Sequence, residues 1–157
     1  MLTFTKAQIK EIATHLDGDS RVYIHPETGE IAYWPDFEET RQDPEKYIQN
    51  LGDKRRAKYE ESTTKWIQIN GMRQRDEIRV MEGFVQTVTL NPLRLSLATA
   101  LGASKPFAAF RAALNSQDEW LQKWFAFKES AWQPWVMRQI EAYRAENGYP
   151  EEVEAAS

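Results

Sequence analysis

The hydrophobic pattern of this chain changes near residue 70, and that change restricts the folds open to it. Before it, two short runs rich in β-forming residues, 21–25 and 30–34, flank a turn that ends in Gly29, which is typical of a β-hairpin. After it, apolar residues recur at intervals of three and four, as they do along amphipathic helices. Strands followed by helices favour an α+β fold.

Two further segments complete the first half of the chain. Thr5 and Gln8 have the spacing of a capping box, and the apolar residues after them predict a helix over about residues 5–16. Residues 64–69 alternate between polar and apolar, so we expect a third strand that pairs with the hairpin. We therefore predict an α+β fold, in which a small antiparallel sheet, the hairpin plus a third strand, packs against a helical C-terminal half.

The segment between the hairpin and the third strand, residues 35–62, is the least determined by its pattern. Residues 36–42 are acidic and polar and indicate a loop. Asp43 followed by Pro44 favours a helix over about residues 44–59. Gly52 lies in the middle of that helix, where glycine costs about 1 kcal/mol relative to alanine.

The second half predicts a series of helices. Residues 73–89 form the first, the Asn91-Pro92 pair starts the second, and Ser104 caps the third. A long aromatic helix follows residue 116, and Pro134 interrupts its pattern. Proline removes a backbone donor and clashes with the preceding turn, so the pattern allows either one kinked helix or two.

The length and composition fit one domain. The chain has 157 residues, of which 41% are hydrophobic and 12% aromatic, enough to build a single core. We expect one domain over residues 1–149. Residues 150–157 are rich in glutamate and predict an acidic, flexible tail.

The absence of cysteine excludes disulfides, thiolate metal ligands and a cysteine nucleophile. No apolar run approaches the roughly 18 residues that suggest a membrane span, and no signal peptide is visible. The formal net charge of −4 does not favour binding of nucleic acid by the protein as a whole. We therefore expect a soluble cytoplasmic protein without a membrane partner.

Several motifs together resemble a known family. They are the hairpin segment 23–31, Met81-Glu82-Gly83-Phe84-Val85, the leucines of 93–101, Lys105-Pro106-Phe107 with Phe110, Arg111 and Leu114, and Trp124-Phe125 with Phe127. In order and spacing they are similar to the bacterial uncharacterised protein family 0158, over roughly residues 20–130. The resemblance implies a small bacterial cytoplasmic protein. It carries over no catalytic residue, because the family has no assigned activity.

Aromatic residues are unusually dense in the last predicted helix. Trp120, Trp124, Phe127 and Trp135 lie near one helical stripe, and a neighbouring stripe is also apolar, so together they exceed what one core-facing side needs. Aromatic side chains beyond the core tend to form interfaces. We therefore name these four as candidates for a protein interface, with a thick helical core as the alternative. The pattern fixes neither the partner nor the oligomeric state.

The basic cluster Lys54, Arg55, Arg56 and Lys58 is the second candidate site. Basic residues interleaved with aromatic rings, here Tyr59 and Trp66, can bind single-stranded RNA by charge and stacking. The glutamates that follow dilute the charge, and a solvated helix face also explains the cluster.

Support for catalysis is weak. Glu82 lies within an apolar helix, where a partly buried acid can be functional or can pair with Arg79 or Arg111. The two histidines, His15 and His25, have no spacing that requires a metal site. Phosphate loops, nucleophile elbows and zinc-protease motifs are all missing from the sequence. We expect neither a metal nor a cofactor.

The function that the sequence favours is a non-enzymatic protein-binding or regulatory module of the bacterial cytoplasm. One alternative is an RNA-associated factor that uses the basic cluster. The other is an enzyme with an unrecognised site near Glu82.

Overall fold

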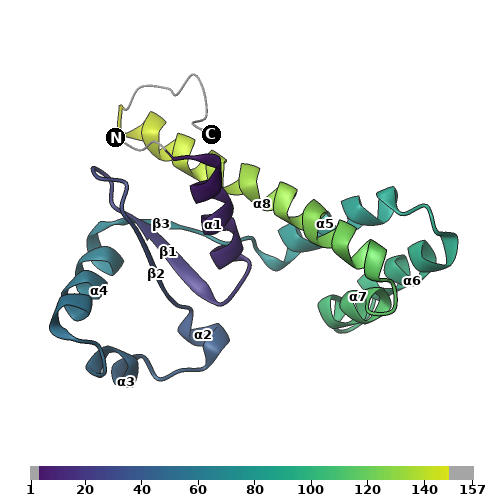
Figure 1. Cartoon of the computed structure of the whole chain (residues 1–157), viewed down its shortest axis with the longest axis horizontal. Helices are drawn as coiled ribbons and strands as arrows, with labels where there is room; N and C mark the ends of the chain where they lie inside the picture. Colours follow the sequence, from purple (N-terminus) through teal and green to yellow (C-terminus); the bar gives the residue numbers. More distant parts are fainter. Residues whose placement is uncertain (1–3, 149–157) are drawn as a thin grey trace. The chain divides into compact units, whose positions relative to one another are not determined.

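The computed structural model of the chain describes residues 4–148. They fall into two compact units, one containing residues up to Gly71 and from Gln133 onward, the other spanning Met72–Trp132. The elements in chain order are α1 (Lys6–Leu16), β1 (Ser20–Ile24), β2 (Ile31–Pro35), α2 (Phe37–Thr40), α3 (Pro44–Gln49), α4 (Asp53–Lys65), β3 (Ile67–Ile69), α5 (Gln74–Thr87), α6 (Asn91–Leu101), α7 (Pro106–Leu114) and α8 (Asp118–Glu146) (Figure 1). That one domain spans 1–149 stays a prediction, and the acidic tail lies outside the described residues.

The first unit contains a three-stranded antiparallel sheet in the order β2-β1-β3. The predicted hairpin is confirmed: His25 N–H donates to the Glu30 carbonyl at 2.8 Å, and Gly29 N–H donates to the His25 carbonyl at 3.0 Å. Gly29 has a φ of 73°, a conformation that glycine adopts without steric cost. The sheet and the mostly C-terminal helices confirm the predicted α+β class.

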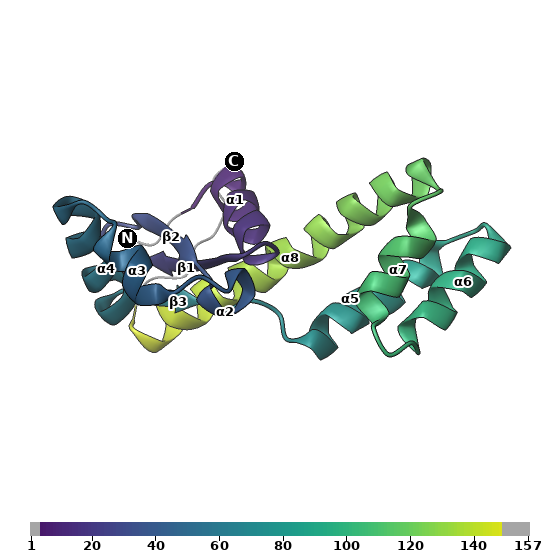
Figure 2. The same cartoon turned by 90° about the horizontal axis from the view of Figure 1, so that it is seen from below.

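Helices cover both faces of the sheet. In both views the strands lie between α1 and α4 (Figure 1, Figure 2). On the α1 side, the His15 ring stacks on Tyr33 of β2, with ring centroids 3.7 Å apart. On the α4 side, a buried cluster is surrounded by partly buried rings and aliphatic groups of α3, α4 and their connection; the buried members are Tyr23, Ala32, Trp34 and Trp66.

The loop predicted over residues 36–42 is wrong, because α2 forms there. The Asp36 carboxylate caps this short helix by accepting from the backbone N–H groups of Glu38 at 3.1 Å and Glu39 at 3.4 Å. The helix ends at Arg41, whose φ is 56°. A capping aspartate followed by glutamates is a helix-start signal, which the polarity of the segment hid.

The single helix predicted over about residues 44–59 is also wrong. The chain forms α3 and then α4, and Gly52 is the N-cap of α4. Glycine is unfavourable inside a helix but acceptable at an N-cap, so the chain breaks there. Because α4 then extends to Lys65, the third strand is shorter than predicted and covers only Ile67–Ile69.

The second unit consists of helices and the short segments that connect them. It comprises α5, α6, α7 and the first half of α8. Its α6 and α7 begin one residue away from the predicted caps, with Leu90 and Lys105 as N-caps, and a proline in each first turn. Pro134 lies inside α8, so the helix continues through it. None of the described helices has the length and apolar character that crossing a membrane requires.

Candidate functional site

Three of the four predicted interface rings pack into the core of the second unit. Trp124 is 7% exposed, and its ring centroid lies 5.2 Å from that of Phe84 and 5.1 Å from that of Phe110. Trp120 and Phe127 are partly buried against the same cluster. This packing is the thick helical core that the sequence left open as the alternative.

Trp135, the fourth ring, belongs to the first unit. Its indole Nε1–H donates to the carbonyl of Asn70 at 2.9 Å. Gln139, one turn further along α8, donates to the same carbonyl at 2.7 Å and accepts from the Asn70 N–H at 2.8 Å. Trp135 therefore fixes the backbone just after β3. Because the four rings are divided between two units, an interface role for them stays a prediction.

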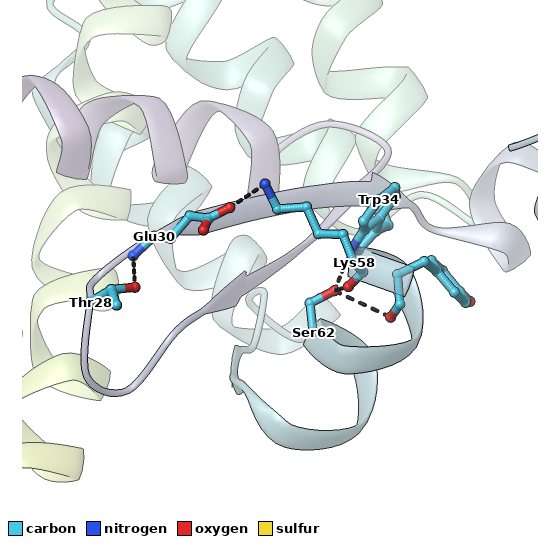
Figure 3. Close-up of polar contacts among 6 residues, drawn as sticks. Thr28, Glu30, Trp34, Lys58 and Ser62 are labelled. Atoms are coloured by element: carbon cyan, nitrogen blue, oxygen red, sulfur yellow. Dashed lines mark hydrogen bonds and ion pairs between the residues drawn. The ribbon is translucent and has the colours of Figure 1, made fainter. Parts of the chain in front are cut away.

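The basic cluster lies on α4 and contacts the hairpin. Lys58 forms an ion pair with Glu30 at the end of the turn, and the backbone N–H of Glu30 donates to the Thr28 hydroxyl at 3.2 Å. One turn further along α4, Ser62 accepts a hydrogen bond from Trp34 (Figure 3). Lys58 thus attaches α4 to the sheet.

Arg55 and Arg56 also contact groups within the protein. Arg56 donates to the carbonyls of Gln49 at 3.1 Å and Leu51 at 3.4 Å, closing the connection between α3 and α4. The Arg55 guanidinium lies 5.2 Å from the Trp34 ring centroid. Lys54 is exposed. Three of the four basic side chains therefore make contacts within the local fold.

The aromatic rings near the basic cluster face inward. Trp66 is 9% exposed, and the Tyr59 ring packs edge-on to Trp34 with centroids 5.2 Å apart. Binding of single-stranded RNA by stacking needs exposed ring faces. These two rings do not provide such faces, so RNA binding at this cluster stays a prediction without its stacking platform.

The two histidines have local structural contacts. His25 Nδ1 accepts from the backbone N–H groups of Glu27 at 3.1 Å and Thr28 at 3.2 Å, which orders the hairpin turn. His15 Nδ1 lies 3.4 Å from the Ser20 hydroxyl. Within residues 4–148, no group of three or more potential metal-binding side chains converges.

Tyr33, the stacking partner of His15, has a perturbed hydroxyl. Burial raises its pKa to about 12, and the negative charge of Glu11 adds to the shift. Both effects disfavour the phenolate. Tyr33 therefore stays protonated under physiological conditions and is not a candidate base.

Glu82 is exposed on α5, so the partial burial expected for it is wrong. It forms no ion pair with Arg79 or Arg111 in the described part of the chain. The Arg111 guanidinium instead lies 4.9 Å from the Phe125 ring centroid. A catalytic role for Glu82 stays a prediction that its surroundings do not favour.

A pocket between α5 and α6 is the feature that the sequence analysis missed. Its volume is about 340 Å³. Residues 91, 94, 95 and 98 share one face of α6 by helical spacing, opposite the face that carries buried Leu93 and Leu97. We call this feature the α5–α6 pocket; its lining residues are Val85, Gln86, Asn91, Arg94, Leu95 and Ala98.

Two of the lining residues, Leu95 and Arg94, give the pocket its apolar surface and its charge. Leu95 is 71% exposed, and Leu90 just before α6 is 41% exposed. Arg94 donates to the side-chain carbonyl of Gln86 at 3.0 Å. The sequence carried a signal for this site, because Leu95 lies two residues from both Leu93 and Leu97 and cannot share their core-facing side.

The described chain thus belongs to the class of α+β proteins, with one unit built on a three-stranded antiparallel sheet and one helical unit that carries an open apolar pocket. It belongs to the Uncharacterised protein family (UPF0158), whose model matches residues 2–155. This match confirms the resemblance noted in the sequence. No curated protein and no solved structure matches the chain.

Proposed function

We propose that the chain is a non-enzymatic protein-binding module of the bacterial cytoplasm that receives a segment of its partner in the α5–α6 pocket. The observation that carries this proposal is Leu95, an aliphatic side chain that is 71% exposed at the edge of that pocket. Burial of a leucine side chain contributes about 1.5–3 kcal/mol of favourable free energy. A partner that covers Leu95 therefore binds more tightly. The absence of cysteine agrees with a reducing compartment.

The chemistry of the lining supports binding over catalysis. General acid–base and nucleophilic catalysis use carboxylates, histidines, thiols, amines or hydroxyls. None of these groups is present among the six lining side chains. The pocket therefore offers an apolar surface and a few polar groups that fix orientation, which is the usual composition of a binding site.

The test is co-purification of partners from a nuclease-treated bacterial lysate, comparing the tagged wild type with Leu95→Ser. Phe107→Ser is the matched control, because it removes another exposed apolar side chain, 39% exposed, that does not line the pocket. All three proteins must first show the same circular dichroism spectrum and unfolding midpoint.

We expect one protein to be retained by the wild type and by Phe107→Ser, and to bind Leu95→Ser about tenfold or more weakly, since tenfold corresponds to about 1.4 kcal/mol. Equal retention by all three proteins would contradict the proposal. A protein that is recovered from an untreated lysate but not from the nuclease-treated one would favour RNA association instead.

A further inference from the structure

We infer that the segment received by the α5–α6 pocket is an acidic amphipathic helix, whose apolar face covers Leu95 and whose carboxylate pairs with Arg94. This inference rests on the proposed function, because it names the chemistry of the partner at the same site. It follows from the backbone around the pocket, from the side chains that line it, and from its charge.

The backbone of the second unit indicates that the bound segment is a helix. A peptide that binds as an added strand needs a sheet edge with free N–H and C=O groups. The described residues of this unit form helices, and the pocket lies between two of them, whose backbone groups are bonded internally. A segment that docks there gains no backbone hydrogen bonds from the pocket, and a helix, which satisfies its own, fits this condition.

The lining excludes two other common ways of binding a peptide. Polyproline segments dock into grooves lined by aromatic rings, and phosphorylated segments bind clusters of arginine. The lining of this pocket contains no aromatic residue and a single arginine, Arg94. Docking of an amphipathic helix requires an apolar surface for residues spaced three and four apart, which the exposed Leu95 and Ala98 provide on α6, beside the buried Val85.

The charge at the pocket indicates an acidic partner. Arg94 is the one charged residue in the lining, and it forms no ion pair within residues 4–148. Its contact with Gln86 uses one of the five N–H donors of the guanidinium. Glu82, one turn before Gln86 on α5, is exposed and makes no ion pair with it. A partner carboxylate can accept two parallel hydrogen bonds from the remaining donors.

The volume of the pocket sets the scale of the contact. About 340 Å³ lies near the lower end of the roughly 300–1,000 Å³ typical of ligand pockets. It therefore accepts a few side chains from one or two turns of a helix. Because few side chains make the contact, binding should depend strongly on the two anchors, Leu95 and Arg94.

The experiment measures binding of two fluorescent synthetic peptides by anisotropy. Each has about 18 residues, long enough to form a helix, with the same leucine face. One carries glutamates beside that face, and the other carries lysines at the same positions. The proteins are the full-length wild type, Arg94→Glu, Leu95→Ser and the control Arg111→Glu, which reverses an exposed charge outside the pocket.

We expect the wild type and Arg111→Glu to bind the glutamate peptide at least tenfold more tightly than the lysine peptide. Arg94→Glu should reverse that preference, and Leu95→Ser should weaken the binding of the glutamate peptide at least tenfold. Full-length proteins with equal circular dichroism spectra and unfolding midpoints exclude misfolding as the cause of any loss.

Each failure has a distinct meaning. If the wild type binds both peptides equally, or if Arg94→Glu keeps the original preference, the acidic partner is wrong. If neither peptide binds the wild type, the helical partner is wrong. In each of these cases the proposed function stands as long as co-purification depends on Leu95. If co-purification is also independent of Leu95, the pocket itself is not the binding site.

Discussion

The indole Nε1–H of Trp34 donates a hydrogen bond to the hydroxyl of Ser62 at 2.9 Å, between side chains 28 residues apart in the chain. Trp34 is 4% exposed and Ser62 is fully buried. The Ser62 hydroxyl in turn donates to the carbonyl of Lys58 at 2.6 Å, so both of its roles are satisfied. This contact joins α4 to β2 inside the buried cluster, beside the ion pair of Lys58 with Glu30.

Replacing Ser62 with alanine should destabilise the protein by about 1–3 kcal/mol, because it leaves the buried Trp34 donor without an acceptor. The free energy of unfolding in urea measures this change. Thr64→Ala is the control, since it removes a hydroxyl that donates to the Glu60 carbonyl at 2.6 Å on the exposed side of the same helix. The control should change stability by no more than about 0.5 kcal/mol. Equal effects of the two substitutions would contradict the bridging role of Ser62.

Replacing Arg56 with methionine should destabilise the connection between α3 and α4. The guanidinium donates to the carbonyls of Gln49 and Leu51, and hydrogen bonds from a charged donor contribute about 1.5–3 kcal/mol when well shielded. Because Arg56 is partly exposed, we expect about 1 kcal/mol. Amide hydrogen exchange should become faster over residues 44–52. Lys54→Met, which removes an exposed cation from the same helix, should leave that exchange unchanged.

Replacing Gly83 with alanine should stabilise the second unit by about 0.5–1 kcal/mol, because alanine is the better residue inside a helix. The added Cβ meets the Phe127 ring at 3.4 Å, an ordinary contact distance. Gly52→Ala tests the opposite case: Gly52 is an N-cap, where alanine is the poorer residue. The two substitutions should shift the thermal unfolding midpoint in opposite directions, and a shift of the same sign would contradict this assignment.

The α+β class and most element boundaries could be predicted because they depend on local signals. The capping box of Thr5 and Gln8 starts α1 as expected, and the turn at Gly29 forms the hairpin. The break between α3 and α4 could not be predicted, because Gly52 suits both a weak helix interior and an N-cap. The contacts that hold α4 against the hairpin, such as those of Ser62 and Lys58, join residues far apart in the chain and are not visible in the local pattern.

The candidate site could be predicted only in part. Helical spacing places Trp124 and Phe127 on one stripe, but it does not say whether other helices cover that stripe, and α5 and α7 do. The α5–α6 pocket depends on the approach of two helices, which no local pattern encodes. In the sequence, the signal for this pocket is the position of Leu95, which cannot share the core-facing side of Leu93 and Leu97.

The stability of the fold should fall between pH 10 and 12 through the titration of Tyr33. Burial, with the charge of Glu11, raises the pKa of this hydroxyl from 10.0 to about 12 in the folded protein. A raised folded pKa means that the stabilisation is complete below the unfolded value and is lost as pH rises through the folded value. Tyr33→Phe should remove this component, seen as a smaller loss of stability over the same pH range and as the loss of one late-titrating phenolate by ultraviolet absorbance. Identical pH profiles would contradict the assignment.

The leucines of α6 test whether the helix is oriented as the structure shows. Leu97 is fully buried and Leu95 is 71% exposed, although both lie in the same run of alternating leucines. Leu97→Ala should cost about 2–5 kcal/mol in the free energy of unfolding, since it leaves a cavity in the core. Leu95→Ala should cost no more than about 0.5 kcal/mol. An equal cost at both positions would mean that Leu95 is covered within the protein itself, and a pocket with a covered Leu95 has no free apolar surface to offer a partner.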